Sequence, residues 1–486
     1  MADKNQRYVD IGRRSPQERP ISERLGDFRE ISARFTHQEA MSQASRCEQC
    51  GVPYCHVYCP LHNNIPDWLR MTAEGRFEEA YRLAETTNNL PEICGRICPQ
   101  DRLCEAKWAC TLEQAGHGTV TIGAVEQFLG DLAFEQGWVR PRTPRAERAQ
   151  HVGIVGAGPA GLAAAQELRA MGYAVTLYDR HGAPGGLLRF GIPGFKLEKD
   201  VIVRRCDHIL RAGVHFVGRF TLGLDATLSE IRQRHDAVLL ALGAYRPNRL
   251  PLPGAERGTV VDGLAYLIAS MGDPAATLLD APEAVNACDR RVVVVGGGDT
   301  AMDCVRTALR QGSCGVICLY RRGELDRTGS RRELEKAVAE GVQVLWRAEP
   351  SAYSPNTVMM MEGKPASCIQ RSNGVLTVRV RDDTDHNIER RLIDAELVIS
   401  AIGNRPELPG FFGASDLATT MRGSVRVNPD TGATNLPGVF AAGDLSRGPS
   451  LAVWAIRDGR AAAHGIHRYL RSSMTAVSDT LSGVAG

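Results

Sequence analysis

The side chains best suited to chemistry are cysteines crowded into one short part of the chain. Eight of the fourteen cysteines fall between residues 47 and 110. They stand at Cys47, Cys50, Cys55, Cys59, Cys94, Cys98, Cys104 and Cys110. Thiolates at such short intervals, in loops broken by Gly and Pro, can point several sulfurs at one centre, and a Cys-Pro pair, as at 59–60 and 98–99, is typical of bacterial iron–sulfur runs. The spacing predicts iron–sulfur clusters and one-electron chemistry.

Two other uses of these cysteines compete with that interpretation. Structural zinc also binds Cys-x2-Cys loops, but it normally needs two well-separated pairs, and the spacing here is irregular. Disulfides need an oxidising compartment, whereas the opening MADKNQRYVDIGRR is polar and lacks the apolar stretch of a secretion signal. The remaining cysteines are scattered, and we expect them to pack as small buried hydrophobes: Cys206, Cys288, Cys304, Cys314, Cys318 and Cys368.

Length and composition restrict the class of protein. A chain of 486 residues is too long for one core and predicts about three domains. The net charge of +2 gives no broad electrostatic footprint for nucleic acid. No apolar run approaches the ~18–20 residues of a membrane span. Together with the free thiols, this predicts a cytoplasmic protein that binds neither nucleic acid nor membrane.

The elements that must position the cysteines are helical. Apolar residues recur with helical spacing in segments such as 65–71 and 77–84. The region up to about residue 138 therefore predicts a small, mostly helical domain wrapped around metal. The Pro- and Arg-rich stretch 140–148 has no periodicity and predicts a linker.

Strands and helices alternate from residue 151 onward. The sequence HVGIV predicts a buried strand, 159–171 an Ala- and Leu-rich helix that begins with Pro, and YAVTLYD a second strand. The same order returns as RVVVV, 300–311 and VICLY. Two such βαβ units predict two nucleotide-binding domains.

The turn of the first unit carries the glycines of a dinucleotide site. Gly156, Gly158 and Gly161 suit a tight turn, a close backbone approach to a pyrophosphate, and a close helix–strand contact. Asp179 ends the second strand, where a carboxylate can accept hydrogen bonds from ribose hydroxyls. Strand, helix and terminal acid together make a plain glycine-rich turn a poor explanation.

The second unit differs at the end of its second strand. Its turn and helix start read Gly296, Gly297, Gly298, Asp299, Thr300 and Ala301, so that alanine replaces the third glycine. Arg321 and Arg322 stand where a ribose-binding acid would be expected. A guanidinium can bind a 2′-phosphate that a carboxylate would repel, so the unit should prefer NADPH to NADH. The alternative is that these arginines merely end a surface strand.

Several segments together resemble a known family. The stretch 151–161, PGGLLRFGIP at 184–193, ALGAYRP at 241–247, AIGNRP at 401–406 and GVFAAGD at 438–444 are similar to the flavoprotein reductases with two dinucleotide-binding domains. The resemblance implies FAD contacts at Gly186, Leu187, Gly443 and Asp444. With the cysteine-rich head, the whole chain resembles the small (β) subunits of bacterial NADPH-dependent glutamate synthases and shares its plan with the N-terminal part of dihydropyrimidine dehydrogenase.

The dihydropyrimidine dehydrogenase pattern also implies a ligand set for two [4Fe–4S] clusters. One cluster would be held by Cys47, Cys50, Cys55 and Cys110. The other would be held at three corners by Cys59, Cys98 and Cys104. The family's fourth corner is a glutamine, and the matching position here is Glu126, with Cys94 as the alternative.

The resemblance implies a fold and its division. We expect an α/β fold with two dinucleotide-binding, Rossmann-like domains preceded by a mostly helical iron–sulfur domain. The expected ranges are 1–145 for the helical iron–sulfur domain, 146–285 for the first part of the FAD-binding domain, 286–400 for the NADPH-binding domain and 401–486 for the second part of the FAD-binding domain.

The same resemblance implies a function. NADPH would reduce FAD, which would pass electrons through two [4Fe–4S] clusters to a large (α) subunit that carries FMN and iron–sulfur and forms glutamate from 2-oxoglutarate and glutamine-derived ammonia. The chain has no N-terminal nucleophilic cysteine and no (β/α)8 pattern, so amination must take place on that partner, in a hetero-oligomer. No catalytic residue of this chain is assigned.

Two alternatives to this function remain. An NADPH:ferredoxin-type or bifurcating oxidoreductase subunit with another partner would share every motif. A scaffold for electron transfer or assembly could keep the nucleotide folds without turnover. Thioredoxin-reductase-like chemistry is disfavoured, because no Cys-x2-Cys pair occurs after residue 110.

Overall fold

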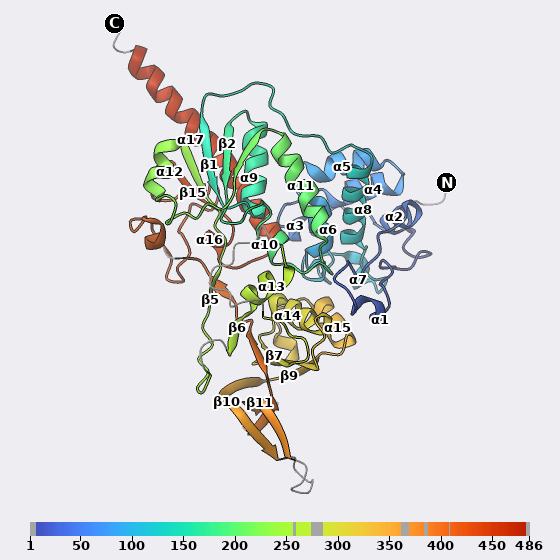
Figure 1. Cartoon of the computed structure of the whole chain (residues 1–486). Coiled ribbons are helices and arrows are strands. Elements are labelled where there is room, and N and C mark those ends of the chain that lie inside the picture. Colours follow the sequence, from blue (N-terminus) through green and yellow to red (C-terminus); the bar gives the residue numbers. More distant parts are fainter. Residues whose placement is uncertain are drawn as a thin grey trace.

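The N-terminal part of the chain forms a helical unit, drawn in blue to blue-green in Figure 1. The structure, a computed structural model, describes residues 6–255, 259–273, 285–360, 369–382, 387–407 and 409–482. The helices of this unit are α1 (Ile21–Arg24), α2 (His37–Ala44), α3 (Tyr54–Tyr58), α4 (Ile65–Ala73), α5 (Phe77–Glu85), α6 (Pro91–Ile97), α7 (Thr111–Gln114) and α8 (Ile122–Glu135).

Helix periodicity explains how this unit is built. Helix α4 buries Ile65, Trp68 and Leu69, and α5 buries Ala80 and Ala84, so each presents one apolar face. These faces pack with α2 and α8 in one hydrophobic core. The N-terminal domain is thus mostly helical, as predicted. Cys55 lies on α3 and Cys94 on α6, whereas the other N-terminal cysteines lie between helices.

The first sheet is entirely parallel, with strand order β15-β4-β1-β2-β3. Its strands are β1 (His151–Val155), β2 (Ala174–Tyr178), β3 (Val214–Val217), β4 (Ala237–Leu240) and β15 (Val439–Ala441). Both faces are covered, because Ile154 belongs to the core under α9 (Pro159–Ala170), α11 (Lys199–Arg211) and α17 (Ala452–Ser482), whereas Val155 belongs to the core under α12 (Leu228–Arg234). Buried faces on both sides are what a parallel sheet requires.

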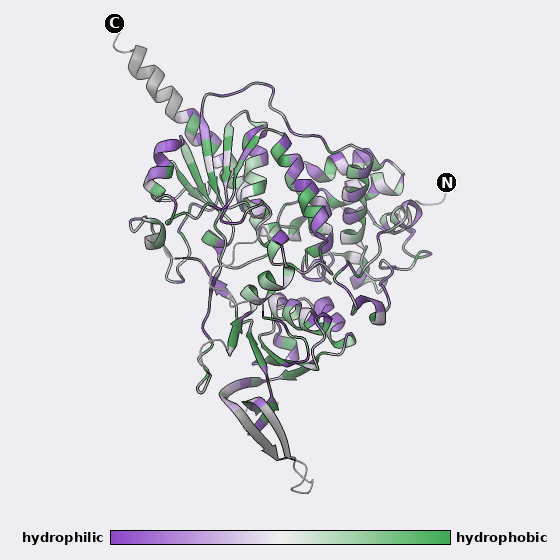
Figure 2. Ribbon diagram, in the orientation of Figure 1, coloured by the Kyte–Doolittle hydropathy of each residue, from purple (hydrophilic) through white to green (hydrophobic). Residues whose placement is uncertain are grey.

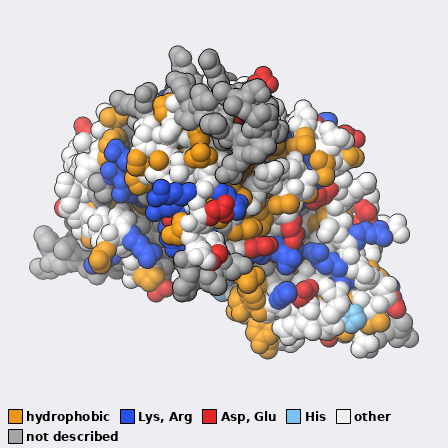
Figure 3. Space-filling model, turned by 90° about the horizontal axis from the view of Figure 1, so that it is seen from below, with side chains coloured by type: hydrophobic (Ala, Val, Ile, Leu, Met, Phe, Trp, Pro, Cys, Tyr) orange, Lys and Arg blue, Asp and Glu red, His pale blue; other side chains and the backbone are white. Residues whose placement is uncertain are grey.

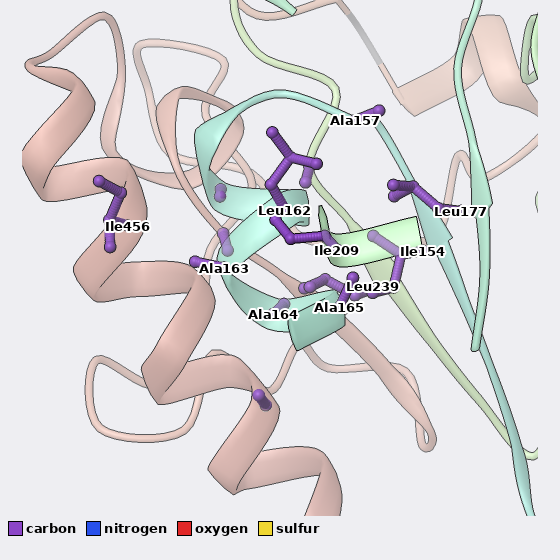
Figure 4. Packing of buried hydrophobic residues seen from close by; sticks show 14 of the residues in the cluster. Ile154, Ala157, Leu162, Ala163, Ala164, Ala165, Leu177, Ile209, Leu239 and Ile456 are labelled. Atoms are coloured by element: carbon purple, nitrogen blue, oxygen red, sulfur yellow. The ribbon is translucent and has the colours of Figure 1, made fainter. Parts of the chain in front are cut away.

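Small residues let α17 approach α9 closely, as Figure 4 shows. Ala163, Ala164 and Ala165 lie in the core with Ile456 of α17. At Gly459 of α17, an added Cβ would lie 2.1 Å from the carbonyl oxygen of Ala160. The C-terminal part of the chain, which supplies both α17 and β15, therefore completes the first nucleotide unit.

The second sheet is also parallel, with order β6-β13-β7-β8-β9. Its strands are β6 (Val260–Asp262), β7 (Arg291–Val295), β8 (Gly315–Tyr320), β9 (Gln343–Trp346) and β13 (Leu397–Ser400), and its helices are α13 (Gly263–Met271), α14 (Asp299–Arg310) and α15 (Arg331–Ala339). Strand β6 lies in the range expected for the first part of the FAD-binding domain, yet it pairs with β13. A strand of three residues is too short to show periodicity, so the expected division at residue 286 misses it.

Two small antiparallel sheets complete the fold. Strands β10 (Ala348–Met360), β11 (Ile369–Arg381) and β12 (Ile388–Asp394) form an arm that projects from the second unit in Figure 1. Strands β5 (Arg246–Pro247) and β14 (Asn404–Arg405) pair where the chain crosses between the two nucleotide units, so both crossings are tied together. The sequence analysis predicted neither sheet.

Hydropathy and charge are distributed as in a globular protein. Apolar residues concentrate on the strands of both parallel sheets, and the helices are two-sided (Figure 2). Basic and acidic side chains are interspersed on the face shown in Figure 3. Within the described residues, no helix is both long and apolar enough to cross a membrane.

Candidate functional site

The first glycine turn has the geometry of a dinucleotide site. Gly156 has a φ of +110°, and an added Cβ would lie 2.2 Å from the carbonyl oxygen of Ala241. An added Cβ on Gly161 would lie 1.9 Å from the carbonyl oxygen of Gly156. Gly158 differs, because its backbone is extended and an added Cβ would meet only the Cα of Gly186, at 3.9 Å. Gly156 and Gly161 have no room for a side chain, whereas Gly158 borders open space.

Asp179 braces this turn. Its carboxylate accepts hydrogen bonds from the backbone N–H of Ala157 at 2.6 Å and of His181 at 2.8 Å. Burial raises the pKa of Asp179, and these two backbone donors oppose that rise. The sequence analysis expected only ribose contacts, so the bracing role is an addition. Each carboxylate oxygen retains a lone pair that could accept from a ribose.

A cavity of about 440 Å³ opens beside the turn and reaches all three units. From the first unit it is lined by seven of the eight predicted flavin residues: Gly156, Gly158, Asp179, Gly186, Leu187, Gly443 and Asp444. Gly161 lies behind the turn. The cavity is large enough for part of a dinucleotide, and Gly158 faces its open space, so these residues fit FAD.

The segments 184–193 and 438–444, which the family resemblance assigned to FAD, also line this cavity. Gly186 has a φ of +52°, and an added Cβ would lie 2.6 Å from the Cα of Gly158, so the two glycines lie face to face. Leu187 begins helix α10 (Leu187–Phe190), and Asp444 begins α16 (Asp444–Arg447). Burial raises the pKa of Asp444 to about 6, although Ser450 donates two hydrogen bonds to it.

The second glycine turn repeats part of this geometry. Gly296 has a φ of +145°, and an added Cβ would lie 2.3 Å from the carbonyl oxygen of Ala401. An added Cβ on Gly298 would meet no atom within 4 Å. Ala301, in place of the third glycine, is fully buried. Gly298 therefore borders open space, as Gly158 does in the first turn.

The residues predicted to bind NADPH lie in two separate places. Asp299 and Thr300, at the start of α14, line the common cavity. Arg321 and Arg322 follow β8 and are exposed outside it. Neither arginine makes an ion pair with another residue of the described part of the chain, so both guanidinium groups are accessible to a phosphate.

Lys196 and Asp303 form an ion pair inside the cavity that sequence reasoning missed. The Lys196 Nζ lies 2.9 Å from an Asp303 oxygen and 3.7 Å from Glu333. Burial raises the pKa of Asp303 to about 6, while Lys196 opposes that rise. Because Lys196 belongs to the first unit and Asp303 to α14, the pair ties the two nucleotide units together at the cavity wall. Nothing in the local sequence around Lys196 signals this long-range pairing.

The eight N-terminal cysteines line two smaller cavities. One is bordered by Cys47, Cys50, Cys55 and Cys110, and the other by Cys59, Cys94, Cys98, Cys104 and Glu126. This division matches the two ligand sets implied by the family resemblance. Among the described residues, no three His, Cys, Asp or Glu side chains converge closely enough to hold a single metal ion.

Burial keeps the thiols of Cys47, Cys55 and Cys59 protonated without a metal. It raises the pKa of Cys47, Cys55 and Cys59 to about 12 in each case. Metal binding must therefore displace the thiol protons, as is general for thiolate ligands. The chemistry of this donor set fits iron–sulfur.

Glu126 and Cys94 meet at the second cysteine cavity. Asn88 donates to a Glu126 oxygen at 2.9 Å, and the Cys94 thiol lies 3.6 Å from the Asn88 side-chain oxygen. Burial raises the pKa of Glu126 to about 8, against the effect of Asn88. Both candidates for the fourth corner therefore border the cavity.

One segment separates the second cysteine cavity from the large one. Cys98 and Gln100 line both cavities. Arg332 of α15 donates to Gln100 at 3.3 Å and to Glu105 at 2.6 Å, which connects the second nucleotide unit to the cysteine-bearing segment. Sequence reasoning identified Cys98 but missed Gln100, which has no recognisable motif.

The scattered cysteines behave in two ways. Cys206, Cys304 and Cys318 are buried as predicted, but Cys288 and Cys314 are exposed, so the prediction is wrong for these two. Both exposed residues lie in turns that precede strands, where side chains face solvent. Cys368 lies outside the described residues.

The two kinds of site define an iron–sulfur flavoprotein of the pyridine-nucleotide class, and family comparisons agree. Residues 24–138 match the family described as dihydropyrimidine dehydrogenase domain II, 4Fe-4S cluster. Residues 150–459 match the pyridine nucleotide-disulphide oxidoreductase family. The chain is an NADPH-dependent oxidoreductase with FAD and iron–sulfur.

Sequence identity to characterised proteins identifies the family more closely. The chain is 50% identical over 474 residues to the glutamate synthase [NADPH] small chain of Azospirillum brasilense, covering 96% of this chain and 97% of that one. It is 40% identical over 471 residues to the protein of that name in Escherichia coli, covering 95% and 98%. The chain belongs to the family of glutamate synthase small chains. Mycobacterium tuberculosis FprA in complex with NADPH shares the fold, with a TM-score of 0.54 and 18% identity over 70% of this chain and 89% of that one.

Proposed function

We propose that this chain is the electron-input subunit of a glutamate synthase, taking electrons from NADPH and passing them to a large chain that forms glutamate from 2-oxoglutarate and glutamine. The observation that carries the proposal is the wall at Cys98 and Gln100, which borders both the nucleotide cavity and a cysteine cavity. When bound, FAD would accept a hydride from NADPH and release single electrons to [4Fe–4S] clusters.

The chain's own residues would bind and orient these groups. We assign FAD to the first glycine turn, with its pyrophosphate in the open space at Gly158, and NADPH to the second turn, with its 2′-phosphate at Arg321 and Arg322. The Lys196–Asp303 pair would hold the two turns at a fixed separation across the cavity. Two [4Fe–4S] clusters would occupy the two cysteine cavities.

The rest of the reaction belongs to a partner. We propose that the large chain carries FMN and iron–sulfur, and that the two chains form a hetero-oligomer. Free thiols that bind iron–sulfur clusters favour the cytoplasm, where such thiols stay reduced.

A second candidate has one observation in its favour. The chain is 38% identical over 487 residues to the putative oxidoreductase AegA of Escherichia coli, covering 97% of this chain and 72% of that one. An oxidoreductase that serves another electron acceptor would therefore use the same plan. The subunit that copurifies with the chain decides between the two candidates.

The experiment uses the full chain, purified anaerobically with FAD. NADPH should bleach the flavin absorbance and support reduction of artificial dyes. The same preparation should form no glutamate from 2-oxoglutarate and glutamine, and addition of the large chain should restore glutamate formation. Glutamate formation by the single chain, or a flavin that NADPH does not bleach, would overturn the proposal.

A further inference from the structure

An exposed apolar patch lies beside the cysteine-bearing segments of the helical unit. It consists of Val52, Tyr54, Val57 and Tyr58, in and just before α3, and Trp108. We call these five residues the α3 patch. They are between 41% and 61% exposed. The rings of Tyr58 and Trp108 meet edge to face with centroids 6.2 Å apart, so the two segments form one surface.

Helix α3 joins this patch to both candidate clusters. Tyr54, Val57 and Tyr58 have the i, i+3, i+4 spacing of one helix face. On the same helix, Cys55 lines one cysteine cavity and Cys59, at its C-terminal end, lines the other. A molecule bound on the patch would therefore be about one helix diameter, roughly 10 Å, from both cavities.

The α3 side of the patch also lacks charge, whereas the exposed Lys107 lies beside Trp108. The stretch 49–66 contains no Asp, Glu, Lys or Arg, although 23% of the residues in the chain are charged. Apolar surface that is rich in aromatic residues and free of charge is typical of the centre of a protein interface. Tyr54 of the patch also lines the first cysteine cavity, so this apolar surface begins at the wall of a candidate cluster site.

We propose that the α3 patch is the docking surface for the electron-accepting large chain, and that the large chain presents an uncharged, mainly apolar surface to it. This inference rests on the proposed function, because it takes the partner to be the acceptor of electrons from the clusters. The position of the patch favours this occupant over a second copy of the chain, since a second copy would cover the route by which electrons leave.

The test measures binding of the purified large chain to the full chain loaded with FAD and iron–sulfur. Val57→Glu places a charge at the centre of the patch and should weaken the affinity by at least about tenfold. Leu392→Glu is the matched control, because Leu392 is equally exposed on β12 of the second unit. It should change the affinity by less than about twofold.

The readouts separate the two proposals. NADPH should bleach the flavin equally in the wild type and both variants, so a loss of docking with normal bleaching supports the patch. If Val57→Glu has normal iron and FAD content and an unchanged affinity for the large chain, the α3 patch is not the docking surface. That result would leave the proposed function intact. Failure of the wild-type flavin to bleach would instead contradict the proposed function.

Two further measurements keep the test decisive. If Val57→Glu loses iron, Trp108→Glu tests the patch from a segment outside α3 and should weaken binding to the same degree. Because the patch is uncharged, the affinity should change by less than about threefold between about 50 and 500 mM NaCl. A strongly salt-dependent affinity, or a variant that disrupts only self-association of this chain, would overturn the inference.

Discussion

At the residue scale, the most informative positions are the two glycines with open space beside them. Gly158 and Gly298 occupy equivalent positions, directly before helices α9 and α14. Both have an extended backbone that any residue can adopt. A side chain at either position would not clash with the protein, so it would occupy the space assigned to a pyrophosphate. Their shared geometry makes them controls for each other.

We predict that Gly158→Val folds but does not retain FAD, because the added side chain fills the pyrophosphate position. Gly298→Val should retain stoichiometric FAD and lose NADPH affinity by at least about tenfold. Bound flavin is measured by absorbance after gel filtration, and NADPH affinity by titration. A Gly158→Val protein with full FAD would place the flavin elsewhere.

Nucleotide choice is also decided by single residues. Arg321 and Arg322 are exposed after β8, and each charge-assisted contact to a 2′-phosphate contributes about 1.5–3 kcal/mol. We predict that replacing both with Ala raises the KM for NADPH by at least about tenfold. The KM for NADH should change little, because NADH lacks that phosphate. Equal losses with both nucleotides in steady-state dye reduction would contradict the assignment.

At the element scale, the fourth corner of the second cluster depends on how α6 and α8 meet. Cys94 lies on α6 and Glu126 on α8, and Asn88 contacts both side chains. The two side chains therefore border one cavity, although they are distant in the sequence.

We predict that Glu126→Ala lowers iron content and alters the electron paramagnetic resonance signal of one cluster more than Cys94→Ala does. The reason is that the family resemblance implies a fourth ligand at the position of Glu126, whose carboxylate can bind iron through oxygen. Iron analysis of the complex with the large chain should give about eight irons from the wild-type small chain. The opposite ranking would move the fourth ligand to Cys94.

The elements that the sequence predicted are those with strong local signals. The helix α9 and the strands β1, β2, β7 and β8 were predicted to within one or two residues, because glycine turns and apolar runs fix them. The short strand β6 and the three-stranded arm were missed. Strand β6 is defined only by its pairing with β13, and such pairing depends on residues far away in the sequence.

At the scale of the whole molecule, buried ion pairs connect the helical unit to the second nucleotide unit. Glu340, after α15, accepts hydrogen bonds from Arg306 and Arg310 of α14 at distances of 2.8–3.0 Å. Arg24 of the helical unit lies 3.1 Å from the same carboxylate. The side chains of Glu340, Arg306 and Arg310 are fully buried. These contacts could not be predicted, because no local pattern marks charged residues that meet only in the folded chain.

Glu340 therefore pairs with three arginines at the junction of the helical unit and the second nucleotide unit. Two of them have a second carboxylate partner, Glu333 for Arg306 and Glu18 for Arg24. We predict that Glu340→Gln destabilises the protein by about 3–5 kcal/mol, because it removes the carboxylate that pairs with the buried guanidinium group of Arg310. Glu335→Gln on α15 is the control, since its ion pair with Arg331 is exposed to solvent, where such pairs contribute little to stability. Chemical denaturation followed by circular dichroism and by FAD release measures both variants.

The pH dependence of stability gives an independent check on this junction. Burial raises the pKa of Glu340, but hydrogen bonds from Arg310 and Arg306 outweigh it and lower the pKa to about 2. A carboxyl whose pKa is lower in the folded state stabilises the protein above its unfolded pKa, about 4.5, and loses that contribution as the pH falls toward 2. The stability difference between the wild type and Glu340→Gln should thus be constant from pH 8 to about 5.5 and shrink below about 4.5. A difference that stays constant down to pH 3 would mean that Glu340 does not act through its charge.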